Sequence, residues 1–259
     1  MTTAISLQTI SNDPAASVPG PIPFSRLVRV EWAKATDTRA ARWLLAICAL
    51  TTVGMVLVPI LAPETLDQTY GGYLRVAALG LTILLPVVAI LMLTGEWSQG
   101  SIMTTFTQEP RRIRVVYAKL TVSMMLGVVA AAFGGLVAAA GIALASASGR
   151  ALEADLSIGT VIGYLIFVLL NVLSGVALGA LLQNSAAAIA ASFALPAGFA
   201  LLGMASTFVS KWIDMSTTWN WILVNDWAGH VPQIVFSMLI WVGIPLVAGI
   251  IRTTRRDVS

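Results

Sequence analysis

The chain has 259 residues, of which 58% are hydrophobic and 10% are charged, and its mean hydropathy is +0.87. Soluble domains carry roughly 25% charged residues, so these values exclude an ordinary soluble domain and predict an all-α polytopic membrane protein. The formal net charge of +3 matches the role of basic residues in orienting membrane helices, and we expect no nucleic-acid partner.

Residues 1–23 are predicted to form a disordered cytoplasmic tail. They contain four prolines and lack the basic start and apolar run of a signal peptide. Residues 24–259 are predicted to form a single transmembrane domain.

The segment FSRLVRVEWAKA follows the tail and carries apolar residues at helical spacing. Its basic residues lie away from this apolar face, which predicts an amphipathic helix over 24–36 on the inner membrane surface. The alternative is a plain cytoplasmic flank of the first span. The residues assigned to this membrane-surface helix are Phe24, Leu27, Val28, Glu31 and Trp32.

Six segments without Asp, Glu, Lys or Arg are long enough to cross the roughly 30 Å of a bilayer's hydrocarbon core. Pro196 and Gly198 are the best candidates for a break in the fifth of them. The predicted spans are residues 43–62, 76–94, 120–149, 156–182, 186–210 and 231–251.

The distribution of basic residues predicts the orientation of these spans. With the N-terminus inside, 12 of the 15 Lys and Arg residues fall in cytoplasmic segments. This bias predicts six transmembrane helices with both termini in the cytoplasm. The last outer segment, residues 211–230, holds four of the eight tryptophans, and two short helices that dip into the outer leaflet would explain them.

Residue types needed for catalysis or direct use of ATP are scarce. None of the three lysines belongs to a phosphate-binding GxxxxGK[ST] motif, and the chain has one histidine and one cysteine. We therefore expect no enzyme activity, no metal and no bound cofactor. The predicted spans also lack the ionisable groups that proton-driven carriers use. A few side chains inside the spans could face a substrate path, namely Asn171, Ser174, Ser192 and Phe193. The three polar ones could equally bond a neighbouring helix or their own backbone.

The stretch from Thr94 to Leu120 interrupts the apolar pattern at a predicted cytoplasmic loop. Gly100 permits a turn, Ser101 can cap a new helix, and Pro110 ends it. A short helix tied to two spans could serve as a rigid contact for a separate ATPase. The residues assigned to it are Glu96, Trp97, Gly100, Ser101, Ile102, Met103, Phe106, Pro110, Arg111 and Arg112.

This stretch resembles the ABC-2 type permease family, whose members show an acid and an aromatic residue, then Gly and Ser or Thr, then Pro with basic residues, then Ala-Lys. The matching positions here are Glu96, Trp97, Gly100, Ser101, Pro110, Arg111, Arg112, Ala118 and Lys119. The resemblance extends over nearly all of the chain from residue 24, because the surface helix, six spans and large last outer loop also match.

The resemblance implies the ABC-2 (type V exporter-like) permease fold and the membrane subunit of an exporter in a bacterial cytoplasmic membrane. Its implied partners are two copies of an ABC ATPase, which bind ATP and Mg, and a second permease copy or a paralogue. A second ATPase contact is implied at Gln183, Asn184 and Ser185. A hydrophobic or amphipathic substrate, such as a drug or antibiotic, would pass between the two permeases along the second and fifth spans.

Two other classes of function stay open. One is a carrier or channel that works without ATP, and the other is a membrane scaffold or sensor subunit that transports nothing.

Overall fold

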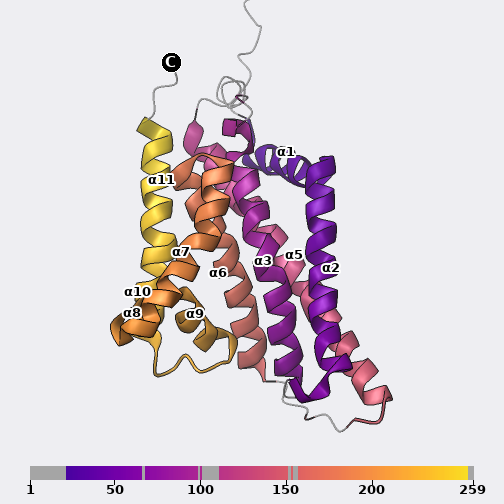
Figure 1. The fold of residues 1–259 in the computed structure, drawn as a ribbon. Helices are drawn as coiled ribbons and strands as arrows, with labels where there is room; N and C mark the ends of the chain where they lie inside the picture. The colour runs from indigo at the N-terminus through magenta and orange to yellow at the C-terminus, as the bar shows by residue number, and fades with distance from the viewer. Residues whose placement is uncertain are drawn as a thin grey trace, which may run out of the picture.

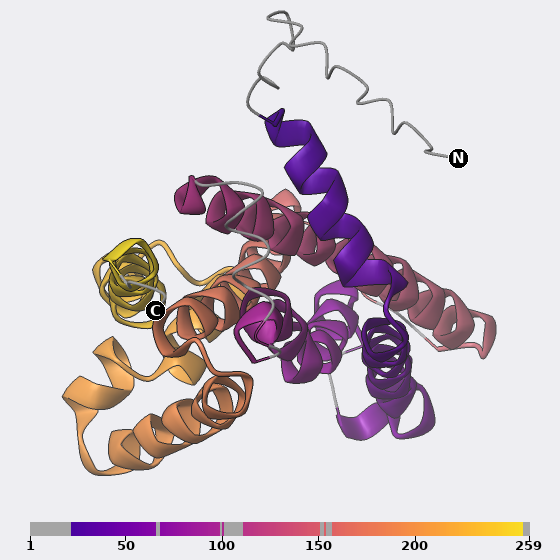
Figure 2. The ribbon, with the colours of Figure 1, turned by 90° about the horizontal axis from the view of Figure 1, so that it is seen from above.

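The computed structural model describes residues 22–65, 68–98, 100, 111–150, 153 and 157–255. Six helices within these ranges are long and apolar enough to cross a membrane, which confirms a polytopic α-helical protein. They form a bundle, and α1 lies across one end of it, here called the α1 end (Figure 1 and Figure 2). The helices are α1 (Phe24–Asp37), α2 (Arg39–Leu61), α3 (Tyr70–Ser98), α5 (Arg112–Ala147), α6 (Ile158–Leu182), α7 (Ser185–Ala205), α8 (Thr207–Trp212), α9 (Met215–Leu223), α10 (Val231–Met238) and α11 (Ile244–Arg255).

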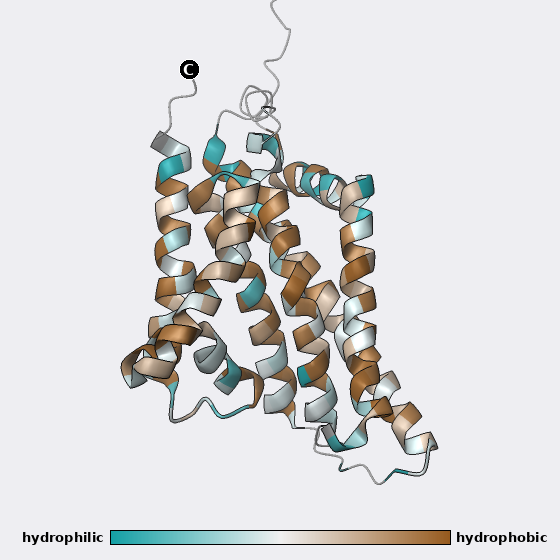
Figure 3. Cartoon of the chain, in the orientation of Figure 1, coloured by the Kyte–Doolittle hydropathy of each residue, from teal (hydrophilic) through white to brown (hydrophobic). Residues whose placement is uncertain are grey.

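Hydrophobic residues cover most of the length of the long helices, whereas hydrophilic residues gather at the α1 end and in the connecting segments at the opposite end (Figure 3). Unpaired polar groups are costly in hydrocarbon, so this pattern indicates which part of each helix lies in the membrane.

Polar side chains define where several helices begin. The Thr38 hydroxyl accepts a hydrogen bond from the Ala41 backbone N–H at 3.2 Å at the start of α2. Ser157 caps α6 in the same way. These caps satisfy backbone donors that have no partner inside the helix.

Helices α3 and α5 both extend beyond the ends that the apolar pattern predicts on the side of the α1 end. Helix α3 continues to Ser98, four residues past the predicted end, and α5 begins at Arg112 rather than at residue 120. Glu96 and Lys119 therefore lie inside helices rather than at their boundaries. The two side chains pair with each other and with α1, which allows the helices to continue through charged positions.

The fifth and sixth spans also differ from their predictions. Helix α7 continues through Pro196 to Ala205, so the expected break was wrong. A proline removes only one backbone donor, which a membrane helix can tolerate. The sixth span instead changes its winding: a π-helical turn at Leu239–Gly243 joins α10 to α11. Trp241 in this turn donates a hydrogen bond to the Ile213 carbonyl at 2.7 Å.

Helix α9 and the last two residues of α8 lie in the tryptophan-rich segment, and these two short helices lie beside the bundle rather than beyond its end (Figure 1). Trp219 is fully buried and packs in a cluster with Leu170 of α6 and Trp241. Trp219 is therefore a core residue of the protein, because α9 folds back onto α6.

Helix α6 approaches its neighbours most closely at glycines. A Cβ atom added to Gly175 would lie 2.5 Å from the Pro86 carbonyl oxygen of α3 and 2.9 Å from the Pro86 Cα. Backbone atoms cannot move aside as a flexible side chain can. The GxxxG spacing at residues 175–179 therefore marks a real contact between α6 and α3.

We expect Gly175→Ala to destabilise the protein by about 1–3 kcal/mol, because α3 and α6 must separate to admit the methyl group. Gly54→Ala in α2 is the matched control, since a Cβ atom there has nothing within 4 Å. Thermal unfolding in detergent measures the difference. Equal midpoints for the two variants would contradict this close packing.

Candidate functional site

The end of α3 and the turn between α6 and α7 meet at the α1 end. The Ser185 hydroxyl lies 2.7 Å from the Thr94 hydroxyl and 2.8 Å from the Ser98 hydroxyl. The Ser185 backbone N–H also donates to Ser98 Oγ at 3.4 Å. These three residues, here called the hydroxyl junction, connect the segment predicted as an ATPase contact with the segment that the family resemblance implies as a second contact.

The same turn is attached to the last helix. Gln183 adopts a left-handed conformation with φ of 51°, which ends α6, and its side chain is buried. Its amide nitrogen donates to the Thr253 hydroxyl of α11 at 2.9 Å. Asn184 then caps α7 by accepting from the Ala187 N–H at 2.9 Å. The turn is thereby held in place by α3 on one side and α11 on the other.

The other residues assigned to ATPase contact are only partly described. Trp97 is half-buried on the last turn of α3, Gly100 forms a turn, and Arg111 and Arg112 lie at the start of α5. The remaining predicted positions lie outside the described residues, namely Ser101, Ile102, Met103, Phe106 and Pro110.

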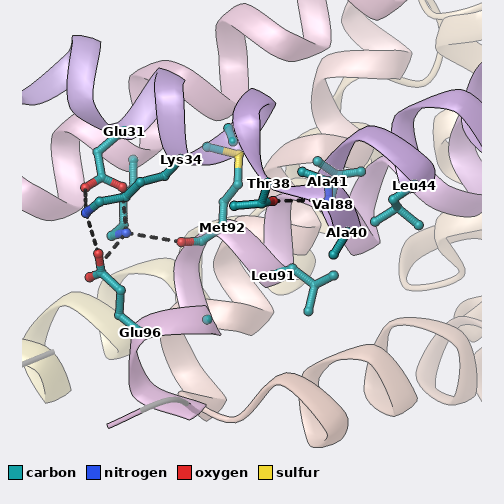
Figure 4. A pocket seen from close by; sticks show the side chains of 13 residues that line it. Glu31, Lys34, Thr38, Ala40, Ala41, Leu44, Val88, Leu91, Met92 and Glu96 are labelled. Carbon is teal, nitrogen blue, oxygen red and sulfur yellow. Dashed lines mark hydrogen bonds and ion pairs between the residues drawn. The ribbon is translucent and has the colours of Figure 1, made fainter. Parts of the chain in front are cut away.

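A cluster of four charges joins α1 to the bundle. Glu31 of α1 accepts hydrogen bonds from Lys34 and from Lys119 of α5, both at 2.7 Å. Lys34 also pairs with Glu96 of α3 at 2.6 Å. Lys119 further donates to the Met92 carbonyl at 3.2 Å. We call these side chains, Glu31, Lys34, Glu96 and Lys119, the charge cluster (Figure 4).

Burial makes the pairing within the charge cluster important. The Lys119 side chain is only 5% exposed and the Glu31 side chain 7%. A buried charge without a partner is strongly destabilising, so each of these two groups depends on the other. Lys34 is more exposed. Burial acts to lower its pKa, but hydrogen bonds to Glu31 and Glu96 outweigh this effect and raise it, so the ammonium stays charged at neutral pH.

The predicted apolar face of α1 is divided between two environments. Val28 and Trp32 pack against a cluster that includes Val88 of α3 and Val122 of α5. Phe24 is exposed, and Leu27 is half-buried. Helix α1 is therefore fixed to the bundle by apolar contacts as well as by Glu31.

A cavity of about 350 Å³ lies between α3, α6, α7 and α9, at the middle of the bundle helices. All four residues that the sequence assigns to a substrate path line it, namely Asn171, Ser174, Ser192 and Phe193. Sequence reasoning missed the contribution of α9, which adds Met215, Ser216, Trp219 and Asn220. The volume falls in the range of small-molecule sites.

The hydroxyl groups in this cavity have already used their protons. Ser174 donates to the Asn171 carbonyl and Ser192 to the Ile189 carbonyl, each at 2.8 Å. Thr82 donates to the Leu79 carbonyl at 3.0 Å. The expectation that these side chains could bond their own helices is thus confirmed for the serines. The same oxygens can still accept hydrogen bonds, and none of the described residues that line the cavity is charged.

Comparisons with models of known protein families and with curated proteins found no match for this chain. The functional argument therefore depends on the geometry of the cavity and the α1 end. Within the described ranges, no group of three or more His, Cys, Asp or Glu side chains could hold a metal ion.

Proposed function

We propose that this chain is the permease subunit of an ABC-2 type exporter in a bacterial cytoplasmic membrane, with both termini in the cytoplasm. In this proposal the α1 end faces the cytoplasm. Two copies of a separate ATPase dock there and bind ATP and Mg²⁺. The chain itself supplies no catalytic residue.

The hydroxyl junction is the observation that carries the proposal. Ser185 bonds to Thr94 and Ser98, so the two predicted ATPase contacts form one mechanical unit. The helices that leave this unit, α3, α6 and α7, each contribute residues to the lining of the cavity. A push on the end of α3 would therefore move these cavity walls as one unit. The ATPase would contact two conformations of the permease differently, and this difference would drive transport.

Helix α7 supports a second permease copy in this proposal. Only 6% of its most apolar window is buried, compared with 61% for α3 and for α6. Phe193 of α7 lines the cavity and is 49% exposed. A partner permease, either identical or a paralogue, would cover this helix and close the cavity from the open side.

The cavity favours an uncharged amphipathic substrate. Its apolar walls include Ile83, Phe167 and Phe193, and its hydroxyl oxygens offer lone pairs. A substrate that donates hydrogen bonds from hydroxyl or amide groups would match these acceptors, whereas a cation would find no carboxylate among the described residues of the lining. Neutral antibiotics of this kind are the first class to test.

We expect Ser192→Phe to reduce ATP-dependent uptake into inverted native vesicles by about tenfold or more, because the added ring fills part of the cavity. The matched control is Ala132→Phe, at an exposed position of α5 that does not line the cavity. Membrane insertion and thermal stability are measured for both variants, so that a folding defect is recognised.

Two results would point to other functions. Uptake that continues without nucleotide would favour an ATP-independent carrier or channel. Absence of ATP-dependent uptake for every compound, with the wild-type chain folded and its ATPase present, would favour a scaffold or sensor subunit.

A further inference from the structure

A second cavity, of about 290 Å³, lies beneath α1 and is separate from the cavity in the middle of the bundle. Helices α1, α2 and α3 and Lys119 of α5 form its walls. One side carries the charge cluster, and the other carries apolar side chains, including Leu44, Val88 and Leu91 (Figure 4). This division between a charged and an apolar wall matches the two parts of an amphipathic molecule.

The charged wall contains one carboxylate oxygen with unused capacity. Glu96 Oε1 accepts from Lys34, but Glu96 Oε2 is buried and makes no hydrogen bond. Lys119 Nζ lies 3.4 Å from this oxygen, which is longer than the 2.7–2.9 Å typical of a charged hydrogen bond. A buried acceptor in this state favours a ligand that brings an N–H or O–H donor.

The charge balance limits the class of ligand. Two carboxylates and two ammonium groups sum to zero, so the wall favours neither a net anion nor a net cation. A zwitterion keeps this balance. Its cationic part would lie at Glu96 Oε2, and its anionic part at Lys34, whose side chain is 43% exposed. Thr38 accepts from Ala41 N–H, so its own hydroxyl proton is free to donate to the same anionic group.

We propose that this cavity binds a phospholipid with a primary ammonium headgroup, of the phosphatidylethanolamine class, from the leaflet on which α1 lies. The ammonium donates to Glu96 Oε2, and the phosphate accepts from Lys34 and Thr38. An acyl chain runs along Leu44 and Leu91 between α2 and α3. Leu91 is 38% exposed, so this wall is continuous with the surface that faces lipid.

The donor requirement separates closely related lipids. Phosphatidylcholine has the same phosphate and net charge, but its quaternary nitrogen carries no N–H. It cannot satisfy Glu96 Oε2. Phosphatidylglycerol lacks the cationic group and adds a net negative charge beside two carboxylates. The site therefore selects the ethanolamine headgroup over both, and this selection does not depend on the proposed transport function.

The test uses the full chain, delipidated in mild detergent and mixed with equimolar phosphatidylethanolamine, phosphatidylcholine and phosphatidylglycerol of identical acyl chains. Native mass spectrometry reports the lipid that stays bound. We expect about tenfold enrichment of the ethanolamine lipid over the choline lipid, the size of one charge-assisted hydrogen bond. Glu96→Gln should reduce this ratio towards one.

A second pair of variants tests whether the lipid binds in this cavity. Leu91→Trp fills the apolar wall and should abolish retention of the ethanolamine lipid, whereas Leu136→Trp, at an exposed position of α5 outside the cavity, should leave it unchanged. Thermal midpoints of all variants identify any that fail to fold. Equal retention of the ethanolamine and choline lipids, preference for phosphatidylglycerol, or equal retention by the two tryptophan variants would overturn the proposal.

Discussion

Replacing Lys119 by methionine, a residue of similar length, is expected to destabilise the protein by about 3–5 kcal/mol. Lys119 is the interior partner of Glu31, at 2.7 Å, and of Glu96, at 3.4 Å. Its loss leaves two largely buried carboxylates with only Lys34 between them. Thermal unfolding in detergent measures the effect.

A double variant distinguishes charge pairing from simple loss of packing. Glu31→Gln combined with Lys119→Met removes one charge of each sign and leaves Lys34 paired with Glu96 at 2.6 Å. We expect this combination to be more stable than Lys119→Met alone. Lys211→Met, at an exposed lysine of α8, is the control and should have little effect. Additive losses in the double variant would contradict a coupled cluster.

The second large effect is expected from Gly100→Pro. Gly100 has φ of +69°, and its N–H lies 3.3 Å from the Trp97 carbonyl. Proline fixes φ near −65° and has no N–H, so it changes the direction in which the chain leaves α3. If an ATPase docks beyond this turn, ATP-dependent uptake should fall by about tenfold or more while the chain stays inserted.

Gly149→Pro is a close control for this experiment. Gly149 also follows a helix, has φ of +80°, and places its N–H 3.0 Å from the Ser146 carbonyl, but it lies at the opposite end of the bundle. The measurements are vesicle uptake and the amount of ATPase that copurifies with each variant. Equal losses in both variants would show a general folding defect, and normal uptake with Gly100→Pro would contradict docking near α3.

The sequence predicts the membrane helices well because each needs a long apolar segment, and that property is local. The sequence-based prediction fails near Glu96 and Lys119, because it ends two spans just before these charged residues are reached. An isolated charge in hydrocarbon is costly, so a charge normally indicates the edge of the membrane. Here Glu31, from a third helix, completes the charge cluster, and no local pattern reports a partner 88 residues away.

The cavity shows the same division between local and distant information. Asn171 and Ser192 were found because a polar residue within an apolar span is unusual. Trp219 and Asn220 were not, since tryptophans in an outer loop normally indicate the membrane interface. The packing of α9 onto α6 decides their position. The alternation of buried Thr218, Trp219, Ile222 and Leu223 with exposed Asn220 is the pattern that could have predicted it.

The hydrogen bonds between the hydroxyl groups of the hydroxyl junction all point the same way, from donor to acceptor. Thr94 gives its proton to the Ile90 carbonyl at 2.8 Å, so Ser185 must donate to Thr94, and Ser98 must in turn donate to Ser185. The dipoles therefore align from the exposed Ser98 to the fully buried Thr94. If Thr94 were lost, Ser185 could reverse its proton toward Ser98 and the remaining bond would survive. If Ser185 were lost, no rotation of the Thr94 and Ser98 hydroxyls could restore the link between α3 and α7.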